Sequence, residues 1–238
     1  YTAIDDPSLY FTSKLYTSTY SSGGGTGATI NVTLDATEDF AVDLVWIKGR
    51  SVGVDNHVIA DRVRGANKNL HSNTTDAEAT NTDEVTAFGD DGFTVGNNDT
   101  VNRDGASSPY VAWCWKESAT SGFDIITWSG NGSNRTIAHS LSTAPKMIIC
   151  KRRDADDTWW TYNETVGAGG QLYLNGTAAA GSDGGVLWNT TAPTSSVFSL
   201  GTNTGVNGSG GTYVAYAFAD VQGFSKFGSY TGNGNADG

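Results

Sequence analysis

The strongest constraint on the fold of this chain is a hydrophobic segment that occurs twice. Residues 110–115 read Tyr-Val-Ala-Trp-Cys-Trp, and residues 213–218, which lie 103 positions later, read Tyr-Val-Ala-Tyr-Ala-Phe. Aromatic and β-branched residues favour β-strands, and Gly, Ser or Pro turn residues precede both copies. Alternate side chains of a strand point to opposite faces, and neither face of these segments is polar. We therefore expect two strands that are covered on both sides, as in the middle of a sheet.

The similarity between the two parts of the chain extends beyond this segment. Further matching blocks keep one order at a nearly constant spacing: 29–34 with 136–141, 44–47 with 147–150, 92–96 with 197–201, 122–123 with 223–224, and 130–132 with 232–234. The separation of 103 positions between the copies is the length of a domain, well above the ~20–50 residues of solenoid repeats. The pattern predicts an internal duplication, with one β domain at 1–118 and a second at 119–221. Residues 222–238 restate the opening of a repeat. We expect them either to begin a third repeat or to add a strand to a sheet edge.

The composition agrees with an all-β fold of short strands and tight turns. The chain has 238 residues, which leaves room for two domains of ordinary size, and it contains 31 glycines but only 4 prolines. Helical periodicity is hardly detectable. Residues 65–90 hold few apolar anchors, and we interpret them as a long loop.

The charge balance and the hydrophobic pattern argue against two classes of partner. Lys and Arg total 14 against 25 Asp and Glu, which gives a formal net charge of −11. An acidic surface repels phosphate backbones, so we expect no nucleic-acid partner. Because no apolar run approaches the ~18 residues that span a bilayer, we expect no membrane insertion.

The two cysteines, Cys114 and Cys150, lie in different repeats. Their repeat partners are Ala217 and Ile47, which are both apolar. This favours two small buried hydrophobic side chains. A disulfide between them remains the alternative at this point.

Several motifs together resemble a family of repeated β-sandwich domains found in structural proteins of tailed phages, especially marine and cyanobacterial phages. The motifs lie at residues 1–8, 45–51, 55–62, 91–95, 122–126, 144–149 and 223–234. The resemblance implies two tandem jelly-roll, concanavalin-like β-sandwiches and a place on the virion surface or in a tail fibre. The implied partners are other virion subunits or copies of the chain itself. The resemblance carries over no catalytic residues.

The densest polar cluster joins Asp55 and His57 to Asp61 and Arg62. His57 and Asp61 are four positions apart, so on a strand they share a face. One interpretation is a carbohydrate site or an acid/base site, with Arg62 as a further ligand-binding residue. The alternative is a local ion pair at a solvated strand end.

The second repeat offers two further candidate sites. Trp159 and Trp160 point to opposite faces if they lie on a strand, so one ring is left to stack on a sugar or to be covered by a neighbouring domain. Asp154, Asp156 and Asp157 gather three carboxylates in one loop, which makes a weak Ca²⁺ candidate; the alternative is a charged β-turn. We expect no other cofactor.

These observations favour a non-enzymatic structural or adhesive module of a phage particle or a similar extracellular assembly, in contact with host surface glycans. The sequence contains no nucleophile-elbow motif, no phosphate-binding Gly-rich loop with Lys and no zinc pattern. Two alternatives stay open. One is a lectin-like carbohydrate-binding module, and the other is a polysaccharide-degrading enzyme.

Overall fold

A computed structural model describes residues 2–19, 29–51, 55–103 and 108–235. These residues form an all-β structure, as expected from the sequence. Its helices are a 3-10 turn, η1 (Pro7–Leu9), and two single turns, α1 (Asp99–Asn102) and α2 (Thr204–Asn207). No helix in the described part of the chain is long and apolar enough to cross a membrane.

The first half of the chain forms one large and one small antiparallel sheet. The large sheet has the strand order β1-β9-β3-β4-β5-β6, and the small sheet has the order β2-β8-β7. The strands are β1 (Phe11–Thr17), β2 (Ile30–Thr33), β3 (Leu44–Gly49), β4 (Val58–Asp61), β5 (Lys68–His71), β6 (Ala79–Thr80), β7 (Val85–Gly89), β8 (Gly92–Val95) and β9 (Pro109–Trp115). The expected long loop at 65–90 therefore contains three short strands.

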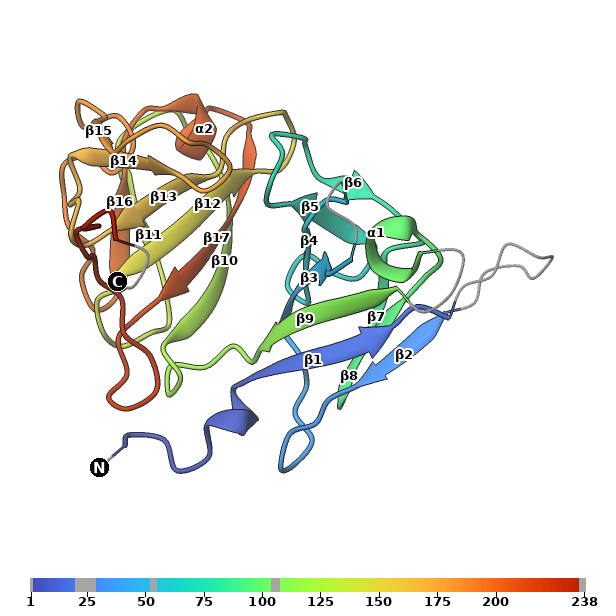
Figure 1. Cartoon of the computed structure of the whole chain (residues 1–238). Helices are drawn as coiled ribbons and strands as arrows, with labels where there is room; N and C mark the ends of the chain where they lie inside the picture. The colour runs from blue at the N-terminus through green and yellow to red at the C-terminus, as the bar shows by residue number, and fades with distance from the viewer. Residues whose placement is uncertain (1, 20–28, 52–54, 104–107, 236–238) are drawn as a thin grey trace.

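The second half repeats this arrangement. Its large sheet has the order β10-β17-β12-β13-β14-β15, and its small sheet pairs β11 with β16. The strands are β10 (Phe123–Ser129), β11 (Arg135–Ala138), β12 (Met147–Arg152), β13 (Trp160–Asn163), β14 (Gly170–Tyr173), β15 (Gly181–Ser182), β16 (Val197–Leu200) and β17 (Thr212–Phe218). Figure 1 shows the first half in blue to green and the second half in yellow-green to red.

The two copies of the repeated segment occupy the same place in the two large sheets. β9 contains residues 110–115 and lies between β1 and β3, while β17 contains residues 213–218 and lies between β10 and β12. Both are thus internal strands, as the sequence predicts. The small sheet covers one face of the large sheet in each half.

The two large sheets pack on one another through a third apolar cluster, which we call the seam. Strand alternation divides the side chains between the clusters: in β3, Val45 and Ile47 face the first small sheet, whereas Leu44 faces the seam. From the second half, Ile149 and Tyr216 enter the seam. The described residues therefore form four sheets with three apolar clusters between them (Figure 1).

Cys114 and Cys150 are free and buried in different cores, which confirms the first interpretation and excludes a disulfide between them. Burial raises the pKa of the Cys114 thiol to about 12.

The described residues 222–235 form no strand; they follow β17 as a loop, with a single bridge between Val221 and Ser225. Residues 236–238 lie outside the described part of the chain.

Candidate functional site

Asp61 lies at the end of β4, inside the seam, and is fully buried. Its carboxylate accepts hydrogen bonds from Arg64 Nε at 2.5 Å and from Tyr216 Oη at 2.7 Å. Tyr216 belongs to the second half, so this cluster joins the two halves. With these two partners, Asp61 makes no pair with His57. His57 lies just before β4 and lines a groove outside the seam. The structure thus separates the two residues of the expected acid/base pair.

Arg62 points away from Asp61 and holds loops of the first half together. Its Nε donates to the Val42 carbonyl at 3.0 Å, and its Nη2 donates to the Gly89 carbonyl at 2.8 Å. The guanidinium also lies 5.5 Å from the centre of the Phe88 ring. These contacts give Arg62 a structural role outside the groove.

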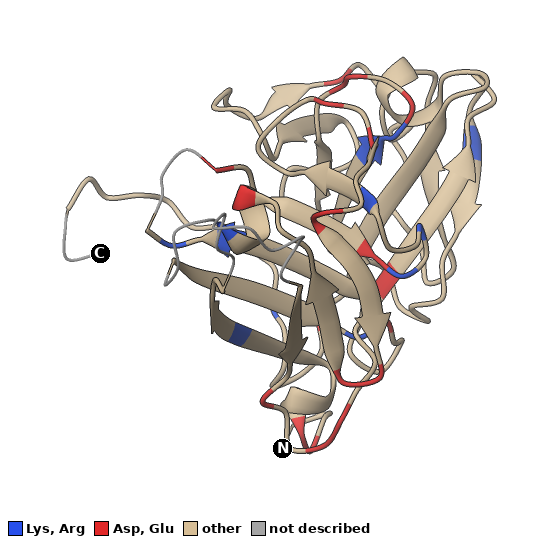
Figure 2. Ribbon diagram, turned by 90° about the vertical axis from the view of Figure 1, so that its right-hand side faces the viewer, with Lys and Arg blue, Asp and Glu red and all other residues tan. Residues whose placement is uncertain are grey.

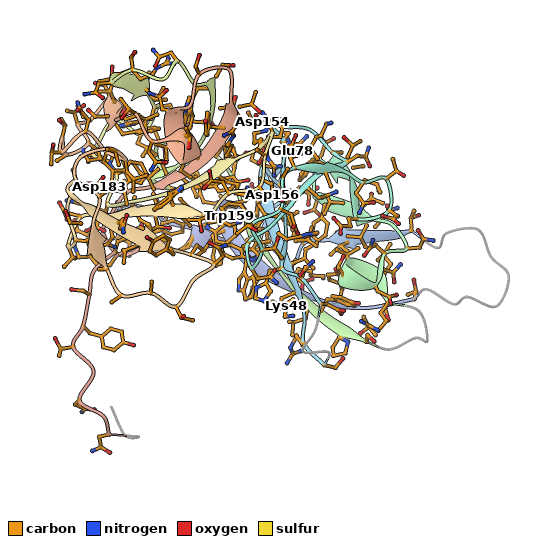
Figure 3. The ribbon with its side chains drawn as sticks, turned by 90° about the horizontal axis from the view of Figure 1, so that it is seen from above. Lys48, Glu78, Asp154, Asp156, Trp159 and Asp183 are labelled. Carbon is orange, nitrogen blue, oxygen red and sulfur yellow. The ribbon has the colours of Figure 1, made fainter. Side chains whose placement is uncertain are left out.

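The two adjacent tryptophans have different surroundings. Trp159 is fully buried in the seam, where its ring stacks on Tyr216 and its Nε1 donates to the His71 carbonyl at 3.0 Å. It therefore offers no surface to a sugar, because the first half covers it (Figure 3). Trp160 is half-buried against the second core and donates to Asp157 Oδ1 at 3.1 Å.

The three carboxylates of the expected Ca²⁺ loop serve three separate partners. Asp154 pairs with Arg152 at 2.9 Å, and this hydrogen bond is the main cause that lowers the pKa of Asp154 to about 2. Asp156 accepts the backbone N–H of Ala77 at 3.0 Å, while Asp157 serves Trp160. No group of three His, Cys, Asp or Glu side chains that could hold a metal ion occurs among the described residues.

Glu78 and Arg153 form a charged link across the seam that the sequence analysis did not anticipate. Arg153 holds both carboxylate oxygens of Glu78 at 2.9 Å, and Arg64 also contacts Glu78 at 2.9 Å. The backbone N–H of Glu78 donates to the Arg153 carbonyl at 2.8 Å. Figure 3 shows Glu78, Asp154 and Asp156 close together where the two halves meet. Acidic residues elsewhere lie mainly in loops and at strand ends (Figure 2).

The most ligand-like feature is a groove beside the seam, which we call the tryptophan groove. It is lined by Trp46 of β3, by Trp113 and Trp115 of β9, and by His57, and its volume is about 320 Å³. Trp46 and Trp113 are directly opposite one another in the sheet, and their rings meet edge to face at 6.4 Å. All four side chains are partly exposed, because the second large sheet covers only part of this face.

A polar rim continues the tryptophan groove toward the second half, with a further volume of about 390 Å³. Its polar lining comes from Ser72, Asn73, Asn175 and Thr177. Asn73 is held in place, because its Oδ1 accepts the backbone N–H of His57 at 2.8 Å and its Nδ2 donates to Asn56 Oδ1 at 2.9 Å.

The tryptophan groove is mostly apolar, its rim is polar, and neither carries much charge. Burial, with a smaller contribution from Lys48, lowers the pKa of His57, so its imidazole is neutral at pH 7. The indole Nε1 of Trp46 is buried and has no hydrogen-bond partner among the described residues. Of the groove residues, only His57 was expected from the sequence. The sequence shows that Trp113 and Trp115 share one face of a strand, but it does not show which of the two rings stays exposed.

Comparisons with known proteins bear only on the family. No curated protein matches the chain, and no solved structure matches it. One family model, described as a domain of unknown function, matches residues 6–238 and spans both halves. Since this match covers nearly all of the sequence, the chain belongs to the DUF7483 family, a domain of unknown function.

Proposed function

We propose that this protein is a non-enzymatic adhesive module that binds glycans through the tryptophan groove. The observation that carries the proposal is the row of three partly exposed indole rings with His57 beside them. A flat apolar ring suits the apolar face of a sugar ring. The amide and hydroxyl groups of the rim supply hydrogen-bond partners for sugar hydroxyls. Both volumes lie within the range of ordinary ligand sites, about 300–1,000 Å³.

Binding fits the lining of the groove better than hydrolysis does. Among the described residues that line it, His57 is the only ionisable side chain. Glycosidases commonly use a pair of carboxyl groups about 5–9.5 Å apart across the scissile bond. The carboxylates of Asp61 and Glu78 are instead committed to arginines inside the seam. The neutral lining favours uncharged saccharides as ligands.

The wider setting of this proposal is a phage particle or a similar extracellular assembly, on the virion surface or in a tail fibre. The matching strand order of the two halves supports descent from one duplicated jelly-roll-like sandwich, with units at 1–118 and 119–221. The phage-like motifs support a structural role with other subunits or copies of the chain as partners.

A glycan array followed by titration of tryptophan fluorescence tests the proposal. Neutral glucose-, galactose- and mannose-containing oligosaccharides are the probes. We expect saturable binding that Trp113→Ala weakens by about tenfold or more, the usual effect of truncating an aromatic anchor. Trp160→Phe is the matched control and leaves affinity unchanged, because Trp160 lies outside the groove.

Three results would contradict the proposal. The glycan site is lost if no saccharide alters the emission at millimolar concentration, or if Trp113→Ala binds like the unaltered protein. The non-enzymatic assignment is lost if the protein turns over a glycan and a single carboxylate substitution abolishes that turnover.

A further inference from the structure

A partly open apolar cavity lies next to the tryptophan groove, and nothing in the proposed glycan site requires it. We call it the seam cavity; its volume is about 250 Å³. Trp46 and Trp115 line it from the first half, and Phe123, Met147, Phe218 and Phe227 are among those that line it from the second. Two serines are the only residues with polar side-chain groups in the lining apart from the indole N–H groups.

The size and lining of the seam cavity indicate an apolar occupant. Protein interiors are close-packed, and voids larger than a water molecule are few. Water enters a cavity readily only where it finds two to four polar partners, whereas an engineered apolar cavity of about 150 Å³ stays dry and binds benzene. The seam cavity is larger than that, and its walls are almost entirely aromatic or aliphatic.

The loop after β17 forms one wall of the seam cavity. Asp220 holds this loop by accepting the backbone N–H of Phe227 at 2.9 Å and by pairing with Lys226. The ring of Phe227 packs on Phe218 with 5.8 Å between the ring centres, and it is only half-buried. A wall made of a surface loop provides a route by which a small molecule enters.

A second observation specifies the polar end of the occupant. Trp46 lines both the seam cavity and the tryptophan groove, and its Nε1 is a buried donor without a partner. Buried donors are nearly always hydrogen-bonded, so an acceptor atom on a ligand would remove this deficit. We propose that the seam cavity is a binding site for an alkyl chain that ends in a single hydrogen-bond acceptor, such as a hydroxyl group. This site goes beyond the proposed glycan site and does not depend on it.

Titration calorimetry with a series of linear 1-alkanols tests the proposal. We expect saturable binding whose affinity rises about fourfold for each added methylene group, the increment for burying one CH₂. The rise stops once the chain fills the cavity. Absence of saturable binding, or affinity that keeps rising with no plateau, overturns the proposal, because the latter is the behaviour of non-specific adsorption.

Variants place the alkanol in the seam cavity rather than in the groove. Met147→Trp fills the cavity, and we expect it to abolish alkanol binding. Phe227→Ala removes part of the loop wall and weakens binding severalfold; it alters a half-buried surface ring, so it serves even if Met147→Trp does not fold. Trp113→Phe is the control, since Trp113 lines the groove and not the seam cavity, and phenylalanine keeps a ring against Trp46; it leaves alkanol affinity unchanged. Loss of binding in Trp113→Phe but not in Phe227→Ala contradicts the assignment.

Discussion

At the scale of single residues, a buried hydrogen-bonded group joins the two halves; it consists of Asp61, Arg64 and Tyr216. Both side chains of the ion pair are fully buried, and Tyr216 donates to the same carboxylate oxygen that accepts Arg64 Nε. Burying charges costs free energy that their attraction only partly returns. Such a pair therefore adds little net stability, but removal of one partner leaves the other charge buried and poorly compensated.

Asp61→Asn is expected to lower the free energy of unfolding by about 3–5 kcal/mol, the usual cost of breaking a buried ion pair. Urea unfolding followed by circular dichroism measures this change. Asp90→Asn is the control, because it removes an exposed carboxylate from the turn between β7 and β8 and should change stability little. An effect of Asp61→Asn no larger than that of the control would show that the pair carries no such role.

The sequence allowed some residue assignments and not others, for physical reasons. Cys114 and Cys150 were predicted correctly as buried, because the apolar character of a repeat position reflects the core that surrounds it. Asp61 was proposed as a ligand-binding residue because it is polar and lies on a strand. Its ion-pair partner, Arg64, lies three positions away, so a local ion pair does form, but it is buried and not at a solvated strand end. Its other partner, Tyr216, is 155 positions away, and no local pattern indicates that contact.

At the scale of elements, the two halves use matching strands, and the accuracy of prediction followed the strength of the apolar pattern. β9 and β17 are internal strands with continuous apolar sequences, so their position was evident. β5 and β6 are short and lie toward the sheet edge, and β7 belongs to the small sheet. None of their sequences alternates regularly between apolar and polar residues, so this region was interpreted as a loop.

The connection between β9 and β10 joins the halves and contains a group of carboxyl side chains. The backbone N–H of Glu117 donates to Asp43 Oδ2 at 2.8 Å, and Asp124 lies beside the Glu117 side chain. Burial, together with hydrogen bonding and repulsion from Asp124, raises the pKa of Glu117 from 4.5 to about 8. Folding therefore favours the protonated form of Glu117 at neutral pH.

This shift predicts a loss of stability as the pH rises from about 4.5 to about 8. The contribution of Glu117 is complete below pH 4.5, the pKa of the unfolded chain, and it disappears as the pH rises through about 8. We expect the melting temperature to fall over this range and to fall less in Glu117→Gln. Glu164→Gln removes an exposed carboxylate and should follow the unaltered protein. Parallel pH profiles for all three proteins would contradict the assignment.

At the scale of the whole molecule, the seam explains both what the sequence predicted and what it missed. Strands covered on both faces were expected, and each large sheet is indeed covered by its small sheet on one face and by the other large sheet on the opposite face. The tryptophan groove lies where the second large sheet no longer covers the first large sheet. Its position depends on how the two sheets are offset, and a linear pattern of side chains contains no information about that offset.

The seam also predicts that the two halves unfold together. Separating them would expose its apolar cluster, remove Tyr216 from the buried Asp61 and remove Arg153 from Glu78, so an intermediate with one folded half is unfavourable. We expect one calorimetric transition whose measured enthalpy equals its van't Hoff enthalpy. Ile137→Ala, which alters only the second core, should lower the temperature of this whole transition without dividing it. Two transitions, or a shift of only part of the heat absorbed, would show that the halves are independent domains that merely touch.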